Sequence, residues 1–385
     1  MLSFNKPSHL VITCSKRLAP FLEQEVIQLG YKIKRSFQTG VELSGTLNDC
    51  IRLNMNLRCA SQVLYSLKSF ACNSPEELYY ITGQIQWETI IPKEGYFSVT
   101  STVEHPSINN NLFVNVKIKD AIADRFREKT MARPDSGPEL KGTVVHLFWR
   151  NETAEIFLDT SGETLAKHGY RKIPGKAPML ESLAAATLMA TKWNRTSSFI
   201  NPMCGSGTLA IEAALLATNR SPGLFRDAYA FQHILGFDEP DFQIQKNSLK
   251  TQIKNIPGLK IVATDISEDA IHIAKINAGI AGVGEIIEFT TCDFEDTTVE
   301  GNSGVVYLNP EYGERMGEQS ELELTYKRIG DFLKKKCRGF TGYIFTGNPE
   351  LGKKIGLKAS RKVEFYNSKI DCRLMEFDLY EGSRK

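Results

Sequence analysis

The residues Asn309-Pro310-Glu311-Tyr312 come directly after an apolar run, VVYL, and directly before a glycine. A turn accounts for the proline and the glycine, but it does not require the amide of Asn309 or the ring of Tyr312. The Asn309 side-chain oxygen and the Pro310 carbonyl oxygen could both accept hydrogen bonds from an exocyclic amine. Those bonds would direct the nitrogen lone pair at an electrophilic methyl group, while Tyr312 could stack on the ring. Asn309, Pro310 and Tyr312 are therefore the predicted catalytic residues, and the structural alternative is a Pro-Gly turn with a surface tyrosine.

A glycine-rich loop in SSFINPMCGSGTLAIEAALLA is the strongest single motif. An apolar strand ends near Ile200, the loop follows, and a helix begins near Thr208. The glycines would let the backbone approach a ligand, and the free N–H groups at the helix start could bind it. The loop also satisfies the dinucleotide pattern G-x-G-x-x-A, which alone is a weak signal. The cofactor-binding residues predicted here are Asn201, Pro202, Cys204, Gly205 and Gly207, although Cys204 also suits a small packing position.

Two later strands end in acids that could hold a nucleoside. Asp265 ends the strand KIVATD, where a carboxylate can accept both ribose hydroxyls, and Asp293 ends the next strand, in position for an adenine amino group. Gly207 and Asp265 are 58 residues apart, against roughly 20 in a dinucleotide fold, so residues 220–258 must be an insertion. The alternatives are a helix cap at Asp265 and a loop acid at Asp293. The predicted cofactor site is completed by Ile266, Phe294 and Asn309.

From about residue 179 the chain alternates helix and strand. The predicted helices are at 180–193, 207–219, 267–282 and 321–336, and the predicted strands at 197–202, 260–265, 286–294, 304–310 and 341–348. Such alternation is typical of an α/β fold with a doubly wound parallel sheet, whose ligands bind outside the carboxyl ends of the strands. Two further strands within residues 362–382 predict a terminal antiparallel hairpin, which is the layout of class I methyltransferases.

Residues 1–160 mix strands and helices, and predict an α+β region without nucleophile, metal or phosphate-loop spacing. The predicted strands are at 9–14, 40–45 and 96–104, with a helix at 17–30 and a hairpin at 142–151 and 153–162. Residues 46–70 have apolar side chains three and four apart and predict one helix, whereas residues 113–130 predict a strand that continues as a helix. The polar, basic residues 161–178 predict a linker before a domain at 179–385.

The composition bounds the class of protein. The 385 residues are 42% hydrophobic and 24% charged, as is usual for soluble globular proteins. The chain lacks an apolar run of about 18 residues and a signal peptide, so neither a membrane helix nor secretion is expected. The eight cysteines and six histidines form no metal-binding pattern, so no metal is expected, and the scattered cysteines indicate a cytoplasmic protein.

Three segments are basic, although the net charge is only +2. Residues 117–150 carry eight Lys and Arg against five Asp and Glu, residues 353–373 seven against two, and residues 163–176 four against one. Charge runs are often only solvated surface, but three of them favour a polyanion such as RNA as the partner. His168 is either a phosphate contact or, more simply, a surface histidine. The predicted RNA contacts are Arg58, Lys117, Lys119, Arg125, Arg133 and Arg171.

Several segments resemble one known family. FINPMCGSGTLAIEAALLATNRSPG, LNPEYGER and FLDTSGETLAKHGYRKIPGKAPMLESLAAA are similar to the THUMP-containing bacterial methyltransferases that modify guanine N2 of 23S ribosomal RNA, the RlmL type. NLRCASQVLYSLKSF and FVNVKIKDAIADRFREK resemble their THUMP region, so the likeness extends over about residues 5–380. It implies a Rossmann-like class I methyltransferase domain, preceded by a ferredoxin-like and THUMP region that grips RNA. It also implies S-adenosylmethionine as the cofactor and 23S ribosomal RNA or its precursor as the partner.

The chain departs from the family's pattern at three places. Asn201 stands where the family usually has an acid, so we expect the contact with the ammonium of the cofactor's methionine part to differ. Glu311 replaces the second proline of an N-P-P-Y box, and could accept from guanine N1–H or point to solvent. His168 replaces the first arginine of an R-G-Y-R sequence.

The favoured mechanism is in-line methyl transfer to an exocyclic amine by positioning and desolvation, without a metal or a covalent enzyme intermediate. Adenine N6 is the alternative acceptor, because an Asn-Pro-x-aromatic box suits either amine. A nicotinamide dehydrogenase is disfavoured by the late acidic strand end, the box after the fourth strand and the terminal hairpin. A non-catalytic RNA-binding or ribosome-assembly factor stays open because of Glu311 and Asn201.

Overall fold

A computed structural model describes residues 2–106, 108, 110–175, 179–301, 303–313 and 319–380. The chain divides into two compact units. The N-terminal unit consists of Met1–Cys14, Leu22–Leu165 and Arg226–Ser248, and the C-terminal unit consists of Ser15–Phe21, Ala166–Phe225 and Leu249–Lys385. Part of the expected insertion at 220–258 therefore groups with the N-terminal unit. The last three residues of the predicted linker, 176–178, lie outside the described residues.

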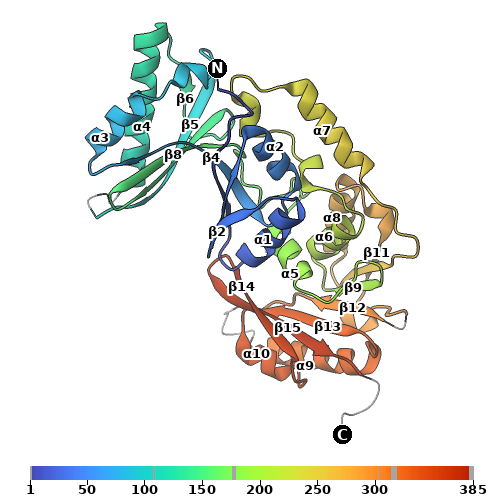
Figure 1. The fold of residues 1–385 in the computed structure, drawn as a ribbon. Helices are drawn as coiled ribbons and strands as arrows, with labels where there is room; N and C mark the ends of the chain where they lie inside the picture. Colours follow the sequence, from blue (N-terminus) through green and yellow to red (C-terminus); the bar gives the residue numbers. More distant parts are fainter. Residues whose placement is uncertain are drawn as a thin grey trace. The chain divides into compact units, whose positions relative to one another are not determined.

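The N-terminal unit is built on an eight-stranded sheet with the strand order β2-β3-β1-β4-β8-β7-β5-β6. Figure 1 labels β2, β4, β5, β6 and β8 of this sheet. Its strands are β1 (Ser8–Cys14), β2 (Ile33–Phe37), β3 (Gly40–Gly45), β4 (Ala60–Ala71), β5 (Tyr96–Glu104), β6 (Asp135–Ser136), β7 (Thr143–Arg150) and β8 (Thr153–Asp159). β5 runs parallel to β6 and β7, and the predicted hairpin of β7 and β8 is confirmed. Its helices are α2 (Leu47–Asn56), α3 (Pro75–Gly83) and α4 (Asn111–Thr130), while α1 (Ala19–Gln28) and α7 (Glu239–Thr251) have residues in both units.

Two sequence-based expectations for the N-terminal unit are wrong. Residues 46–70 do not form one helix, because α2 ends at Asn56 and β4 begins at Ala60. The centre of β4, residues 63–66, is buried without interruption, so its apolar residues do not alternate as in a half-exposed strand. The strand expected at the start of 113–130 is instead the beginning of α4, where Asn110 caps the helix and Val114 and Ile118 are buried one turn apart.

The C-terminal unit contains a seven-stranded sheet with the order β11-β10-β9-β12-β13-β15-β14. Its strands are β9 (Ser198–Pro202), β10 (Ile261–Asp265), β11 (Ile287–Thr291), β12 (Gly304–Leu308), β13 (Thr341–Thr346), β14 (Arg361–Asn367) and β15 (Ile370–Asp378). Its helices are α5 (Glu181–Met189), α6 (Thr208–Ala217), α8 (Glu268–Ile280), α9 (Gln319–Lys336) and α10 (Pro349–Lys354). The first five strands are parallel and β15 is antiparallel to both neighbours, so the predicted doubly wound sheet with a terminal hairpin is confirmed.

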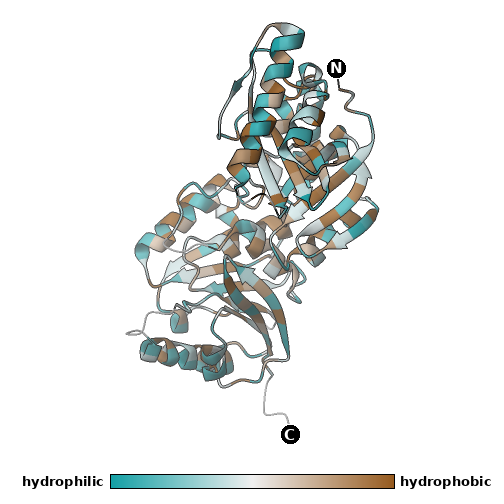
Figure 2. Cartoon of the chain, turned by 90° about the vertical axis from the view of Figure 1, so that its left-hand side faces the viewer, coloured by the Kyte–Doolittle hydropathy of each residue, from teal (hydrophilic) through white to brown (hydrophobic). Residues whose placement is uncertain are grey.

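Helices α9 and α10 lie along one face of the strands β13 and β15 (Figure 1), where Tyr326 and Phe332 pack with Val306 and Ile344 in one core. All residues of α6 are buried, as expected for a helix that is apolar on every side. The surface helices instead carry hydrophobic and hydrophilic residues side by side (Figure 2), because only one face of each packs against a sheet. Within the described residues, no helix combines the length and the hydrophobicity that crossing a membrane requires.

Candidate active site

The glycine-rich loop joins the end of β9 to the start of α6. The Cys204 N–H donates to the Thr264 carbonyl oxygen on β10 (2.9 Å), and the Gly207 N–H donates to the Cys204 carbonyl oxygen (3.0 Å). Gly205 and Gly207 have φ angles of +55° and +81°, which favour glycine. A Cβ on Gly207 would lie 2.9 Å from Ala274 Cβ on α8, whereas a Cβ on Gly205 would meet no atom within 4 Å. Gly207 thus permits the close packing of α6 and α8, while Gly205 faces open space that a ligand can enter.

Asp265, at the end of β10, ties this loop to the start of α8. Its Oδ2 accepts from the Gly205 N–H (2.9 Å), and its Oδ1 accepts from the Ser267 N–H (3.0 Å). The cap of α8 is Ser267, whose hydroxyl oxygen accepts from the Ala270 N–H, so helix capping does not account for Asp265. The neighbouring Ile266 is 74% exposed. An exposed apolar side chain beside a carboxylate suits the mixed apolar and polar character of a nucleoside.

Asp293 follows β11 and is fixed by Arg328 of α9. Both carboxylate oxygens of Asp293 accept from Arg328 Nη2 (2.9 Å each), which also donates to Glu295 (2.6 Å). Burial would raise the pKa of Asp293, but the hydrogen bonds from the Glu295 N–H and from Arg328 outweigh it and lower that pKa. Phe294 is buried, with its ring against Phe332 and under the Arg328 guanidinium, so it supports this corner from the core. Arg328 was not identified from the sequence, because α9 is basic and amphipathic and no local pattern distinguishes one of its cations from the others.

Two side-chain amides lie at the ends of the neighbouring strands β9 and β12. Asn201 is fully buried, and its Nδ2 donates to the Tyr307 carbonyl oxygen (2.8 Å). Asn201 Oδ1 and Asn309 Oδ1 are both buried, and neither accepts a hydrogen bond from any residue that the structure describes. Buried polar atoms are nearly always paired, so these two oxygens are available to accept hydrogen bonds from a ligand.

The residues after Asn309 differ in exposure: Pro310 is buried, Glu311 is exposed and Tyr312 is half-buried. Tyr312 Oη accepts from Asn367 Nδ2 (2.8 Å), and its ring lies so close to Gly347 that a Cβ there would approach it to 2.9 Å. Burial raises the pKa of Tyr312 to about 12, so its hydroxyl stays protonated. Asn367 was not identified from the sequence, because it lies 55 residues away at the end of β14. The last two residues of LNPEYGER are outside the described residues.

Residues 166–175, within the predicted linker, pack against the glycine-rich loop and α6. His168 is fully buried, and its Nδ1 lies 2.6 Å from Oε1 of the equally buried Glu212 on α6. Both expectations for His168, a phosphate contact or a surface histidine, are therefore wrong. Arg171 donates to Glu181 (2.9 Å) and to the Thr208 hydroxyl (3.3 Å) at the start of α6. Its place in this internal network argues against its predicted contact with RNA.

The other predicted RNA contacts lie in the N-terminal unit, and they differ from one another in burial and in ion pairs. Arg58 is only 7% exposed, and Arg125 donates twice to Glu88 (2.6 and 2.8 Å). These internal positions argue against a direct role of Arg58 and Arg125 in RNA binding. The three predicted contacts that form no ion pair within the described residues are Lys117, Lys119 and Arg133.

Comparison with protein families assigns most of the chain to known domains. The family described as RMKL-like, methyltransferase domain matches residues 168–376. An RlmL ferredoxin-like domain matches residues 9–64, and a THUMP domain matches residues 72–159. The ribosomal RNA large subunit methyltransferase K/L of Syntrophotalea carbinolica is 33% identical over 387 residues, which cover 97% of this chain and 54% of that protein. The protein of the same name from Methylococcus capsulatus is 35% identical, over 95% of this chain and 50% of that protein. The chain thus spans about half the length of these curated relatives.

Solved structures with the same fold match nearly the whole chain. A possible methylase from Clostridium difficile 630 is 28% identical with a TM-score of 0.88, covering 99% of this chain and 100% of that one. A predicted N6-adenine-specific DNA methylase from Listeria monocytogenes is 28% identical with a TM-score of 0.87, covering 98% and 97%. The SMU.472 protein, crystallised with SAH, is 25% identical with a TM-score of 0.87, covering 98% and 100%. These likenesses confirm the predicted fold class, and the chain belongs to the family of RMKL-like methyltransferases, with an RlmL ferredoxin-like domain and a THUMP domain before the methyltransferase domain.

Proposed function

We propose that the chain transfers a methyl group from S-adenosylmethionine to the exocyclic N2 of a guanine in 23S ribosomal RNA or its precursor, in the cytoplasm. The observation that carries the proposal is that the buried Asn309 Oδ1 accepts no hydrogen bond from the described residues. It lies at the end of β12, next to the strand that leads into the glycine-rich loop and directly before Pro310. The curated relatives named ribosomal RNA large subunit methyltransferase K/L support the reaction class.

The C-terminal unit fits S-adenosylmethionine in three respects. Gly205 faces open space, Asp265 presents a carboxylate at the strand end, and Asn201 Oδ1 is a buried acceptor without a donor. We assign the ribose hydroxyls to Asp265, the adenine to Ile266 and Asp293, and the ammonium of the methionine part to Asn201. When bound, S-adenosylmethionine supplies an electrophilic methyl group on a sulfonium. The neighbour crystallised with SAH supports this assignment.

The residues of the chain prepare the acceptor amine. Asn309 Oδ1 and the Pro310 carbonyl oxygen accept hydrogen bonds from the two N–H groups of the amine. The nitrogen lone pair is then free to attack the methyl group. Because this corner is buried, these hydrogen bonds compete less with water than exposed bonds do. Tyr312, held at its hydroxyl by Asn367, offers a ring on which the base stacks. A base in a structured strand must first rotate out of its stack to reach this site.

Glu311 favours guanine over adenine at this site. Its carboxylate is exposed beside the box, where it can accept a hydrogen bond from guanine N1–H. Adenine N1 carries no hydrogen, and its lone pair would face the same carboxylate. Adenine N6 is the second candidate acceptor, supported by the similarity to a structure described as a predicted N6-adenine-specific DNA methylase.

The test is methyl transfer from radiolabelled S-adenosylmethionine to a 23S ribosomal RNA transcript without native modifications, followed by mass spectrometry of the nucleosides. We expect N2-methylguanosine with the natural chain. Asn309→Ala should lower the rate at least a hundredfold while the affinity for SAH, measured by calorimetry, changes less than twofold. N6-methyladenosine as the product would replace guanine with adenine, and absence of transfer to any RNA would overturn the proposal.

A further inference from the structure

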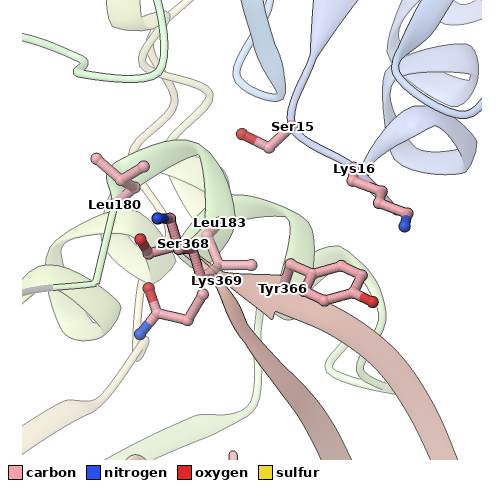
Figure 3. Close-up of a pocket in the computed structure, with 8 residues that line it drawn as sticks. Ser15, Lys16, Leu180, Leu183, Tyr366, Ser368 and Lys369 are labelled. Atoms are coloured by element: carbon pink, nitrogen blue, oxygen red, sulfur yellow. The ribbon is translucent and has the colours of Figure 1, made fainter.

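A cavity of about 380 Å³ lies in the C-terminal unit (Figure 3). Three segments that are distant in sequence form it: the stretch before α1, the start of α5 and the turn between β14 and β15. We call it the hairpin pocket, and its lining residues are Ser15, Lys16, Leu180, Leu183, Tyr366, Asn367, Ser368 and Lys369. Its volume is that of a site for a small molecule or for one unit of a polymer.

The charged side chains of the hairpin pocket are both cations. Lys16 and Lys369 are exposed, and neither forms an ion pair with any residue that the structure describes. The neighbouring Arg17 is different, because its guanidinium is neutralised by Glu364 and Asp371. The pocket therefore presents two uncompensated positive charges, which select an anion.

The remaining lining is apolar and aromatic. Leu183 is buried and Leu180 is half-buried, and both line the same cavity as Tyr366 (Figure 3). Lys16 Nζ lies 5.0 Å from the centre of the Tyr366 ring and the Arg17 guanidinium 4.4 Å from it, so the ring is oriented by cation–π contacts. A flat ring that carries a negative charge matches this lining, and a nucleotide has both features.

The hairpin pocket shares one wall with the candidate active site. Asn367 lines the pocket and donates from Nδ2 to Tyr312 Oη (2.8 Å), the tyrosine that we assign to the methylated base. Cys372 Sγ, on β15, lies 3.9 Å from the same oxygen. A group that enters the pocket therefore contacts the residue that sets the position of Tyr312.

We propose that the hairpin pocket binds a nucleotide of the RNA strand adjacent to the methylated one. Its base lies between Tyr366 and the two leucines, and its phosphate between Lys16 and Lys369. The inference rests on the proposed function, because it takes the base at Tyr312 to be part of an RNA. The two lysines, which form no ion pair with the described residues, together with the basic segment 353–373 that contains Lys369, favour a polymer with several phosphates over a free mononucleotide.

The first test measures RNA affinity of the full chain. Lys16→Glu together with Lys369→Glu should weaken binding of a single-stranded 23S-derived RNA at least tenfold in fluorescence anisotropy. The dependence of log affinity on log salt should become shallower by about one to two units, as expected for two lost phosphate contacts. The matched control is Lys335→Glu with Lys358→Glu, two exposed lysines of the same unit that form no ion pair with the described residues. The control should weaken binding less than threefold, and equal losses in both variants would show a diffuse charge effect and overturn the pocket.

The second test locates the nucleotide. The same RNA carrying 4-thiouridine next to the target should photocrosslink to a peptide that contains Tyr366. Tyr366→Phe should keep this crosslink and the RNA affinity, since the ring remains, whereas Tyr366→Ala should lose both.

Crosslinks only to other peptides would overturn the inference about the pocket. The proposed function would still stand in that case if methyl transfer, measured separately, is observed. A crosslink at Tyr366 without methyl transfer would reject the proposed function alone. GMP is the probe for a free mononucleotide. If GMP binds in the pocket and the glutamate variant keeps its RNA affinity, the pocket is a mononucleotide site and the inference is overturned.

Discussion

At the scale of single residues, the two orphaned amide oxygens have different tasks. Asn201 lies at the end of β9, where the resemblance leads one to expect an acid, and Asn309 lies at the end of β12. A carboxylate at the fully buried position 201 would place a charge in the interior, at a large desolvation cost. The neutral amide avoids this cost and still offers an acceptor. We therefore infer that Asn201 avoids this cost in the ligand-free site and, in the proposed assignment, makes a weaker, uncharged contact with the ammonium.

Asn201→Asp tests this interpretation. The substitution replaces the donor Nδ2 by an oxygen that faces the Tyr307 carbonyl oxygen, now 2.8 Å from the amide nitrogen. We expect the ligand-free protein to lose about 1–3 kcal/mol, the cost of a buried group without its partner. SAH should raise the melting temperature of this variant more than that of the natural chain, because its ammonium supplies the missing charge. Scanning calorimetry with and without SAH measures both effects, and an equal SAH response in the two proteins would contradict the assignment of the ammonium to residue 201.

At the scale of elements, the glycine-rich loop separates a packing role from a binding role. Gly207 begins α6 against α8, and Gly205 faces the open side of the loop. Asp265 then fixes the loop from β10 through the Gly205 N–H. The loop thus connects β9 to α6, is hydrogen-bonded to β10 and packs against α8, while its Gly205 side faces open space.

The two glycines should respond differently to alanine. Gly207→Ala brings a Cβ to 2.9 Å from Ala274 at a φ of +81°, so we expect a loss of about 1–3 kcal/mol from overpacking together with about 1–2 kcal/mol from the left-handed backbone. Gly205→Ala should carry only the backbone cost, about 1–2 kcal/mol, but should lower the affinity for SAH at least tenfold because its methyl group enters the open space. Calorimetric melting and SAH titration of both variants check this pattern. Unchanged SAH affinity in Gly205→Ala would remove the ligand from that side of the loop.

One histidine contacts acids on two other strands of the N-terminal sheet, and its contribution to stability depends on pH. His9 on β1 lies 2.9 Å from Glu155 of β8 and 3.7 Å from Glu42 of β3. The hydrogen bond to Glu155 and the charges of both acids raise the pKa of His9, despite partial burial. A raised pKa stabilises the folded state fully below the unfolded value of about 6.5, and this contribution is lost as the pH rises through the folded pKa.

His9→Gln should therefore lower the melting temperature more at pH 5.5 than at pH 8.5. The exposed His272 of α8 provides the matched control, because it has no recorded ion pair with the described acids. His272→Gln serves as the reference at the two pH values for the loss of an exposed imidazole. If the loss in His9→Gln exceeds that reference by the same amount at both pH values, the two acids do not favour the protonated imidazole.

Features that depend on residues close together in the sequence could be predicted, and contacts between residues far apart in the sequence could not. Local patterns identified the parallel sheet, its terminal hairpin, the glycine-rich loop and the acids at residues 265 and 293, because strand ends and turns have short sequence signatures. β4 was missed because a strand buried throughout its centre has no alternation. The partners His168 and Glu212 are 44 residues apart, and Arg328 and Asp293 are 35 apart. Such pairs are brought together only by the packing of helices on the sheet, so no local pattern could reveal them.

At the scale of the whole molecule, the two units differ in the kinds of functional residues that they contain. The C-terminal unit contains every residue that we assign to the cofactor and the methylated base, and the described part of the N-terminal unit contains no group of metal-binding residues. The structure narrows the predicted RNA contacts of the N-terminal unit to Lys117, Lys119 and Arg133, since Arg58 and Arg125 have internal positions. Contacts to phosphates give affinity and register rather than sequence recognition. We therefore expect the N-terminal unit to contribute RNA affinity without affecting the cofactor.

Lys117→Gln, Lys119→Gln and Arg133→Gln, combined in the full chain, test this division. Each lost phosphate contact should make the dependence of log affinity on log salt shallower by about 0.7–0.9, so the triple variant should lose about two to three units and bind RNA at least tenfold more weakly at low salt. Its affinity for SAH should stay within twofold of the natural chain, because all three residues lie in the other unit. The matched control replaces three exposed lysines of the N-terminal unit, Lys32, Lys34 and Lys93, by glutamine and removes the same charge. Filter binding at two salt concentrations compares the two variants. If both lose RNA affinity equally, the effect follows from net charge alone, and α4 with the residues after it does not form the RNA contact.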